Sequence, residues 1–278
     1  MRVAVIGASG GMGSFFVRYF LARGESVSGS DKRPMKDVPP GMRFFSSNSD
    51  AVKGSDVTIL ATPMDETVAA LRGVAKSLKR GSLVVEIGSI KGDTLPSLRR
   101  ALGGRGRLVS IHPLFGPALV STKGMKVAVI SGREEAARLF PEARIIPMGS
   151  KEHDRAMAVV LGLTHIMNLA YAGTAARFLT PDEFTKVSTP NSSMQLTLAE
   201  AVLAQDPRLT SAIQARNPYS KAVARAALKE LERISRMVEA SDARSLEGQF
   251  RRLSKRYKAD RRAAAVIGEV YSAAEKQP

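Results

Sequence analysis

The chain has 278 residues, of which 44% are hydrophobic and 24% are charged, and it contains no cysteine. This composition excludes a disordered chain, and the length favours a globular protein of two domains. Without cysteine there can be no disulfide framework and no thiolate chemistry. We see no apolar stretch that approaches the roughly 20 residues of a membrane span, and the apolar N-terminal segment is too short for a signal peptide. We therefore expect a cytoplasmic protein with no membrane partner.

The formal net charge is +16, and the basic residues are spread over the whole chain. Residues 1–150 carry 22 Lys and Arg against 12 Asp and Glu, and the remaining residues carry 20 against 14. The densest basic run consists of Arg251, Arg252, Lys255, Arg256, Lys258, Arg261 and Arg262. Such a run is typical either of a nucleic-acid footprint or of a solvated helix face, and we favour the solvated face. A positive field would also attract an anionic substrate and a dinucleotide.

The first 150 residues alternate short β-branched runs with helical patterns, which is typical of a βαβ sheet. Strands are expected at Arg2–Ile6, Ser26–Ser30, Val57–Ala61, Leu83–Ile87, Leu108–Ile111, Val127–Ile130 and Arg144–Ile146. Helices are expected at Ser14–Arg23, Asp65–Leu78 and Asp93–Leu102. Because the apolar runs lack strict alternation, the strands should be buried on both faces, as in a doubly wound parallel sheet of the Rossmann type.

From Glu152 to Ala274 the strand pattern gives way to Ala, Leu, Arg and Glu at helical spacing. Four prolines divide this region, each best placed near a helix start: Pro181, Pro190, Pro207 and Pro218. We predict a dinucleotide-binding domain over residues 1–150 and an all-helical domain over residues 151–278. The second domain holds more apolar helix than a substrate lobe needs, so we also expect a homodimer.

The first predicted strand leads into a glycine-rich turn and then a helix. The turn comprises Gly7, Ala8, Ser9, Gly10, Gly11, Met12 and Gly13. In this setting backbone N–H groups bind a pyrophosphate at the positive end of the helix. Ala8 occupies the first glycine position of the dinucleotide fingerprint, whereas Gly10 and Gly13 fill the other two, and a merely tight turn is the alternative. Thr62 and Pro63, which follow a later strand, are expected at the same cofactor site.

An acidic residue follows the second predicted strand. Asp31 lies 18 residues past Gly13, near the place where a carboxylate binds the adenosine ribose hydroxyls of NAD. Lys32 and Arg33 come next and could instead hold the 2′-phosphate of NADP. We expect NAD, with NADP as the alternative.

The chain has only three histidines, and His112 closes a predicted strand at the edge of the cofactor crevice. Catalysis in such sheets takes place outside the carboxyl ends of the strands. A histidine there is suited to act as general base for an alcohol that loses hydride, because its pKa lies near working pH. The alternative is a histidine that caps a loop.

Several segments resemble the prephenate/arogenate dehydrogenase family of tyrosine biosynthesis. They are the Gly7–Gly13 turn, Gly88-Ser89-Ile90-Lys91, His112-Pro113-Leu114-Phe115-Gly116-Pro117, and Glu152-His153-Asp154-Arg155 leading to Leu163-Thr164-His165. The resemblance implies an NAD(P)-dependent oxidative decarboxylation of prephenate or arogenate, to 4-hydroxyphenylpyruvate or tyrosine, and a homodimer. It also implies that His112 polarises or deprotonates the ring hydroxyl and that Ser89 hydrogen-bonds this hydroxyl.

The resemblance places Lys91 and His165 beside a small anionic substrate and gives His153 a structural role. The family commonly binds a substrate carboxylate through an arginine, but Ser193 and Ala201 stand where basic residues would be expected. Either another cation takes this role or the substrate differs from prephenate. The candidates are Arg216, which we favour, Lys221 and Arg177.

Two other functions compete with this one. The first is another nicotinamide-dependent dehydrogenase of the same two-domain plan, and the His112 segment argues against it. The second is a non-enzymatic dinucleotide-binding regulator that uses the basic run on nucleic acid. We expect no nucleic-acid partner, because no recognition module can be identified in the sequence.

Overall fold

The computed structural model describes residues 1–92, 94–119, 121–259 and 261–274. The chain divides into two compact units, Met1–Met157 and Ala158–Pro278. The first unit contains an eight-stranded sheet with helices, and the described residues of the second form helices joined by loops. The predicted fold class, a Rossmann-type sheet followed by a helical domain, is confirmed. The predicted domain boundary at residue 150 falls where the last helix of the first unit begins.

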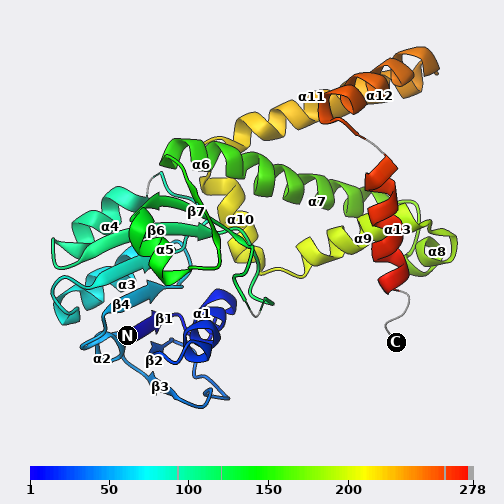
Figure 1. Ribbon diagram of the computed structural model, residues 1–278. Helices are drawn as coiled ribbons and strands as arrows, with labels where there is room; N and C mark the ends of the chain where they lie inside the picture. Colours follow the sequence, from blue (N-terminus) through cyan, green and yellow to red (C-terminus); the bar gives the residue numbers. More distant parts are fainter. Residues whose placement is uncertain (93, 120, 260, 275–278) are drawn as a thin grey trace. The chain divides into compact units, whose positions relative to one another are not determined.

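The sheet has the strand order β3-β2-β1-β4-β5-β6-β7-β8 (Figure 1). Its strands are β1 (Arg2–Ile6), β2 (Ser26–Ser30), β3 (Met42–Phe45), β4 (Val57–Leu60), β5 (Leu83–Glu86), β6 (Arg107–Pro113), β7 (Lys126–Ser131) and β8 (Arg144–Pro147). The strands from β3 to β6 are parallel, but β7 is antiparallel to β6, and β8 is parallel to β7. The expected all-parallel sheet is therefore wrong at this edge. A parallel neighbour needs a crossover, usually a helix, and the described residues between β6 and β7 form none.

Helices cover both faces of the sheet. They are α1 (Gly11–Ala22), α2 (Asn48–Val52), α3 (Thr67–Val74), a short 3-10 turn (Ala75–Ser77), α4 (Thr94–Leu102), α5 (Arg133–Leu139) and α6 (Ser150–Met157). Val3 and Val5 of β1 belong to the core that contains α1 and α5, whereas Ala4 and Ile6 face α2, α3 and α4. This alternation explains why the buried strands are apolar throughout. Asp93, where helix α4 was expected to begin, lies outside the described residues.

An aromatic cluster holds α1 against the sheet. Phe15, Phe16 and Phe20 of α1 are buried, and the Phe16 ring lies 5.9 Å from that of Phe140. The hydroxyl of Tyr19 donates a hydrogen bond to the carbonyl oxygen of Leu139 at 3.0 Å, so its polar end is satisfied inside the core. The helix that begins at the glycine turn is therefore anchored along its buried face.

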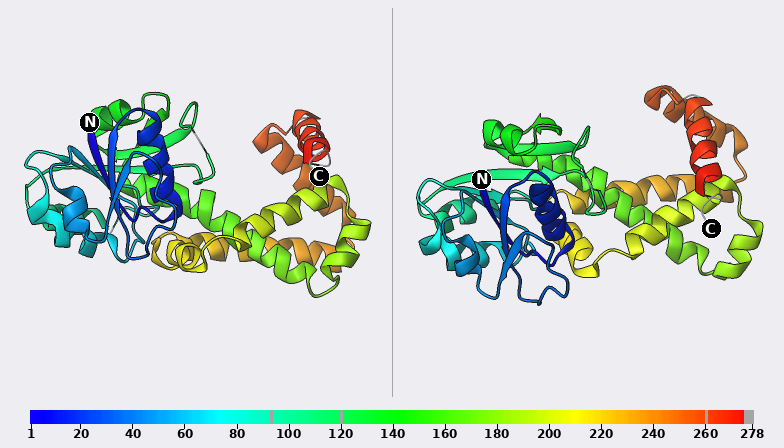
Figure 2. Two further views of the ribbon diagram at one scale, coloured as in Figure 1. Left: turned by 90° about the horizontal axis from the view of Figure 1, so that it is seen from below. Right: turned by 60° about the horizontal axis from the view of Figure 1, so that its bottom comes forward.

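The second unit begins with a π-helical segment, Ala158–Leu163. Its helices are α7 (Thr164–Ala175), α8 (Pro181–Val187), α9 (Pro190–Leu203), α10 (Pro207–Arg216), α11 (Ser220–Glu239), α12 (Ala243–Tyr257) and α13 (Arg261–Ala274). Three of the four prolines stand at the first position of a helix, where a missing N–H costs no hydrogen bond. Within this unit α9 packs against α7, and α11 and α12 form a helical hairpin (Figure 2).

One helical run meets the length and composition of a membrane span. Residues Ser150–Ala175 include an 18-residue window of mean hydropathy 1.4, and 28% of that window is buried. The expectation that no apolar stretch approaches this length is therefore wrong. Length and composition alone are weak evidence for a span, and the run also carries buried polar side chains at His153, Asp154 and His165.

Candidate active site

The glycine turn after β1 depends on two close backbone contacts. Gly7 has φ +87°, and a Cβ atom there would lie 2.5 Å from the carbonyl oxygen of Ala61 at the end of β4. A Cβ atom at Gly13 would overlap the carbonyl oxygen of Gly7. Both positions therefore need glycine for α1 to begin directly against β1.

The turn leaves a set of backbone donors at the start of α1. The N–H groups of Gly7 and Ala8 donate to the carbonyl oxygen of Ser30, and that of Gly10 donates to Gly7. The N–H groups of Gly11, Met12 and Gly13 have no acceptor among the described residues. Donors at a helix N-terminus, where the helix dipole is positive, can bind a phosphate.

Asp31 lies beside this turn. Its Oδ2 accepts from the N–H of Ser9 at 3.1 Å, and its Oδ1 accepts from the N–H of Arg33 at 2.9 Å. The neighbouring Lys32 ammonium is paired with Glu66 at 2.8 Å. The Arg33 guanidinium lies 3.9 Å from Asp31 Oδ1. The carboxylate is thus fixed next to the glycine turn, and each of the two nearby cations has an anionic partner.

Thr62 and Pro63, the other expected cofactor residues, close the turn between β4 and α3. The Thr62 hydroxyl donates to the Thr67 hydroxyl at 3.0 Å, and the latter donates to the carbonyl oxygen of Pro63 at 2.9 Å. The structure therefore gives these two residues a defined local role in starting α3, while contact with a cofactor stays a prediction.

The sequence pattern predicted a strand that ends at Ile111, just before His112. In the structure β6 continues to Pro113, and His112 is its next-to-last residue. The strand continues because β7 pairs with it, with His112 opposite Ala128. The pairing shifts register between Ser110 and Ile111, just before the histidine. Such irregularities re-aim side chains next to functional sites.

The segment after His112 returns to the start of α1. The Phe115 ring lies 5.3 Å from that of Phe15, and Arg18 donates to the carbonyl oxygen of Pro117 at 3.0 Å. A Cβ atom at Gly11 would lie 3.1 Å from the Pro117 side chain. The structure thereby brings the His112 segment and the glycine turn together within one unit.

His112 is the first member of a buried chain of three side chains. Its Nδ1 lies 3.0 Å from Nε2 of His153, and Nδ1 of His153 lies 2.8 Å from Oδ1 of Asp154. The carboxylate of Asp154 also accepts from the N–H of Lys91 at 2.9 Å and from that of Gly92 at 2.8 Å. Helix α6 is therefore joined both to the histidine and to the turn after β5.

Lys91 is fully buried and already has protein partners. Its Nζ lies 2.6 Å from Glu86 Oε1 and donates to the carbonyl oxygen of Ile111 at 2.6 Å. The Ser110 hydroxyl donates to the same carboxylate oxygen. The ammonium thus links β5 to β6 immediately before His112, and its expected contact with a substrate stays a prediction.

The pKa values of this cluster follow from burial and charge. Burial, the nearby Lys91 ammonium and His153 together hold the pKa of His112 well below the ordinary value of 6.5. Burial alone would raise the pKa of Asp154, but the hydrogen bonds from His153, Lys91 and Gly92 outweigh it and lower the pKa. His112 is therefore neutral, and Asp154 ionised, at neutral pH.

The remaining predicted residues are not hydrogen-bonded to this cluster among the described residues. Ser89 is half-buried in the turn after β5, and its hydroxyl has no hydrogen bond to a described residue. His165 belongs to the second unit, where it is buried and its Nδ1 has no partner among the described residues. Burial lowers its pKa. Arg216 ends α10 in the same unit and is exposed.

Three residues of the cluster around His112 were not among the predicted site residues: Glu86, Ser110 and Asp154. His153 was interpreted as structural. The only signal in the sequence was the family segment that contains the His153-Asp154 pair, because nothing in their local spacing indicates contact with β6.

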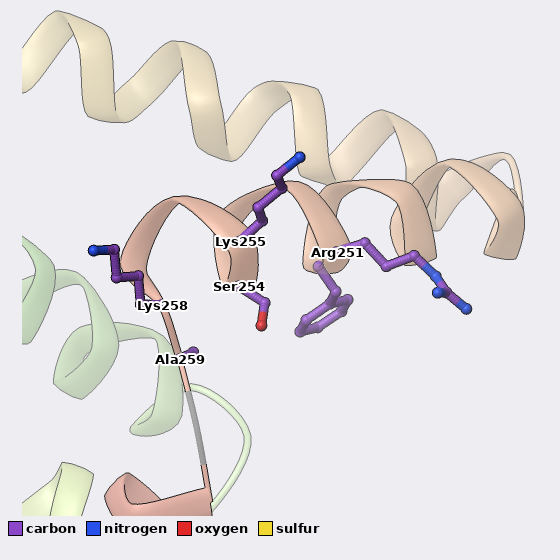
Figure 3. A pocket seen from close by; sticks show the side chains of 6 residues that line it. Arg251, Ser254, Lys255, Lys258 and Ala259 are labelled. Carbon is purple, nitrogen blue, oxygen red and sulfur yellow. The ribbon is translucent and has the colours of Figure 1, made fainter.

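A concavity of about 760 Å³ lies on the second unit, along α12 and the residue positions just after it. Arg251 and Lys255 extend from this helix, and Lys258 from the position just after it, in different directions (Figure 3). The concavity contains none of the predicted site residues. It is a surface feature of the basic run and does not add to the candidate active site.

Two family models match the chain. The model described as the nucleotide-binding domain of prephenate dehydrogenase matches residues 18–134, and the model of the dimerization domain matches residues 149–252. This chain belongs to the prephenate dehydrogenase family. The resemblance seen in the sequence is thereby confirmed.

Relatives in the family carry related names. The probable arogenate/prephenate dehydrogenase of Methanocaldococcus jannaschii is 26% identical over 87% of this chain, which spans only 58% of that relative's length. The 4-amino-4-deoxyprephenate dehydrogenase of Streptomyces pristinaespiralis is 24% identical, with 91% of this chain and 90% of the relative covered.

The fold is also similar to that of a solved family member. The prephenate dehydrogenase of A. aeolicus, crystallised with hydroxyphenyl propionate and NAD+, superposes with a TM-score of 0.73 at 19% identity. The superposition covers 94% of this chain and 98% of the other. At this identity the likeness supports the two-part fold and not a particular substrate.

Proposed function

We propose that the chain is an NAD-dependent dehydrogenase that converts prephenate or arogenate to 4-hydroxyphenylpyruvate or tyrosine with loss of carbon dioxide. The observation that carries this proposal is a buried, neutral histidine at the end of β6, in a segment that packs on the phosphate-binding turn. Such a group is suited to remove a proton from an alcohol that loses hydride. Membership of the family supports the same reaction.

The residues present fit a dinucleotide. The free N–H groups of Gly11, Met12 and Gly13 would hold the pyrophosphate, and the carboxylate of Asp31 would accept from the ribose hydroxyls. Pairing of Lys32 with Glu66 leaves less positive charge for a 2′-phosphate, which favours NAD over NADP. The nicotinamide, when bound, accepts the hydride.

The protein's own contribution to the chemistry is proton transfer and orientation. Neutral His112 accepts the proton of the substrate hydroxyl as hydride leaves the ring carbon that bears this hydroxyl. The ring carboxylate then departs as carbon dioxide, and its bonding electrons make the ring aromatic. The proton returns from His112 to the resulting phenolate oxygen, so the histidine ends the cycle neutral.

The substrate carboxylates need a cation, since burying an unpaired anion is costly. Ala201 and Ser193 lie on α9 and offer none. We favour Arg216, with Lys221 and Arg177 as alternatives; all three are exposed and have no acidic partner among the described residues. If each becomes alanine without raising KM, the substrate is not prephenate-like.

The test is an absorbance assay for NADH or NADPH with three substrates: prephenate, arogenate and 4-amino-4-deoxyprephenate. The third is included because a relative named for it is matched over 90% of its length. We expect turnover of prephenate or arogenate with NAD. No turnover of any of the three with either cofactor would overturn the proposal.

A further inference from the structure

We propose that His153 and Asp154 are positioning residues that fix the tautomer of His112, so that its Nε2 carries the lone pair. This inference rests on the proposed function only in naming Nε2 as the atom that accepts the substrate proton. The contacts that carry it are the two hydrogen bonds that join the three side chains.

Asp154 accepts hydrogen bonds from the protein backbone. Its two oxygens face the backbone N–H groups of Lys91 and Gly92, and both of these groups are obligatory donors. These two bonds stabilise the charged form and help to hold the pKa of the carboxyl below its ordinary value. The carboxylate is therefore ionised, and the atom of His153 that lies 2.8 Å away, Nδ1, must donate to it.

The proton on Nδ1 of His153 also determines which nitrogen of His112 carries a proton. A neutral imidazole carries one N–H, so a proton on Nδ1 of His153 leaves its Nε2 as an acceptor. Nδ1 of His112, 3.0 Å from that acceptor, must then hold the proton of its own ring. The lone pair of His112 is left on Nε2. This atom has no hydrogen-bond partner among the described residues, and it is not itself buried.

The surrounding charges keep His112 in this neutral form before reaction. The Lys91 ammonium opposes a second proton on the ring, and its own partner, Glu86, lies on β5. Once Nε2 has taken the substrate proton, the His112 ring is positively charged. Its Nδ1–H still donates to His153, which in turn donates to the Asp154 carboxylate, so the negative charge of Asp154 stabilises the charged ring. The same geometry thus fixes the tautomer first and stabilises the imidazolium afterwards.

Two substitutions separate tautomer control from a merely structural role. In Asp154→Asn the amide nitrogen can take the place of Oδ1 and donate to Nδ1 of His153, with loss of the bond from the Lys91 N–H. This reverses both tautomers and puts a proton on Nε2 of His112. In His153→Gln the amide oxygen can accept from Nδ1 of His112, so the useful tautomer is retained. The matched control is Glu152→Gln, the same chemical change at an exposed position on the same helix.

The direct measurement is NMR of selectively ¹⁵N-labelled histidine in the full chain, which has only three histidines to assign. Long-range ¹H–¹⁵N correlations distinguish a ring protonated at Nδ1 from one protonated at Nε2. We expect the Nδ1–H form of His112 in the parent, in Glu152→Gln and in His153→Gln, and the Nε2–H form in Asp154→Asn. An Nε2–H form in the parent would overturn the proposal without any variant.

The kinetic measurement uses whichever substrate the parent turns over. We expect Asp154→Asn to lower kcat by about 100-fold or more, as loss of a correctly oriented base does, with NAD affinity within a few-fold. We expect His153→Gln to retain more activity than Asp154→Asn. Equal losses of kcat in these two variants, with the tautomer of His112 unchanged by NMR, would assign His153 and Asp154 a purely structural role. A parent that turns over no substrate would refute the proposed function and leave the NMR test intact.

Discussion

His112 is the side chain whose replacement should separate chemistry from cofactor binding. His112→Asn keeps a polar side chain of similar size, so we expect folding and NAD affinity to be retained within a few-fold. Removal of the base should lower kcat at least about 100-fold. Steady-state kinetics with an independent NAD titration would check this, and a variant that kept most of its kcat would leave His112 as a loop-capping residue.

The pH dependence follows from the same residue. Because burial lowers the pKa of His112, the base stays unprotonated down to a pH below its ordinary value of 6.5. We expect kcat/KM to be level around neutrality and to fall only as the pH drops below 6.5. A limb near or above neutrality would contradict the environment described for His112. This shifts our sequence-based expectation of a base that titrates near neutrality.

Asp31 should decide between the two nicotinamide cofactors. Asp31→Ala removes an acceptor for the ribose hydroxyls, and a bond to a charged group contributes about 1.5–3 kcal/mol. We therefore expect NAD to bind at least about tenfold more weakly and NADP to be affected less. Lys32→Ala is the matched control, because its ammonium is engaged by Glu66. A parent that already prefers NADP would contradict this prediction.

The site divides into residues that local sequence could predict and residues that it could not. The glycine turn, Asp31 and His112 belong to short motifs, and the neighbouring residues were enough to predict their chemistry. The contact between Lys91 and Asp154 joins positions 63 residues apart, and it depends on where α6 packs. Full burial of Lys91 likewise depends on β5 and β6 being neighbours in the sheet, which no local pattern specifies.

At the scale of elements, the start of α1 should tolerate no side chain at Gly13. Gly13→Ala would force a Cβ atom into the carbonyl oxygen of Gly7, so we expect a lower melting temperature and loss of NAD binding. Gly73→Ala is the matched control, since nothing lies within 4 Å of a Cβ atom there and its φ is ordinary. We expect this control to be neutral or to gain up to about 1 kcal/mol. Equal melting temperatures for the two variants would refute the close contact.

The Lys91–Glu86 pair offers a test of whether Lys91 holds strands together. Lys91→Met should leave the Glu86 carboxylate buried without its cation, at a cost of about 3–5 kcal/mol in unfolding free energy. Adding Glu86→Gln should recover part of that loss. Denaturant unfolding of both variants would check this. An unchanged stability together with a raised KM would instead assign Lys91 to the substrate.

The sheet shows which elements can be predicted from a pattern. The buried central strands are long apolar runs, and the observed bounds match the predicted ones closely. Strand β3 was missed because Met42–Phe45 is a short edge strand, only partly buried. The predicted direction of β7 was also wrong: the strand is antiparallel to β6. A strand buried on both faces is apolar whether its neighbour is parallel or antiparallel, so composition could not predict the direction.

At the scale of the whole molecule, the second unit exposes apolar side chains that a monomer would leave in water. Phe178, Phe250 and Tyr257 are 80%, 75% and 77% exposed. Together with the match to a dimerization domain, this supports a homodimer through the helical unit. We expect light scattering at micromolar concentration to give twice the mass of one chain, and a monomeric mass would refute it.

A pair of variants should locate that interface. Phe250→Ser with Tyr257→Ser removes two exposed rings from α12, so we expect a weaker dimer. Val38→Ser, an exposed apolar position of the first unit, is the control and should leave the mass unchanged. The same mass for both variants would place the interface away from this part of α12.

Helix α6 also bears on how such a protein could evolve. By sequence it falls in the stretch matched by the dimerization model, which begins at residue 149, but by its contacts it belongs to the first unit, which extends to Met157. His153 and Asp154 therefore lie on the far side of the family boundary from His112 and Lys91, with which they share hydrogen bonds. A recombination that joined one nucleotide-binding part to a foreign helical part at residue 149 would separate these partners. A joining point after Met157 would instead keep α6 with the sheet and these partners on the same part.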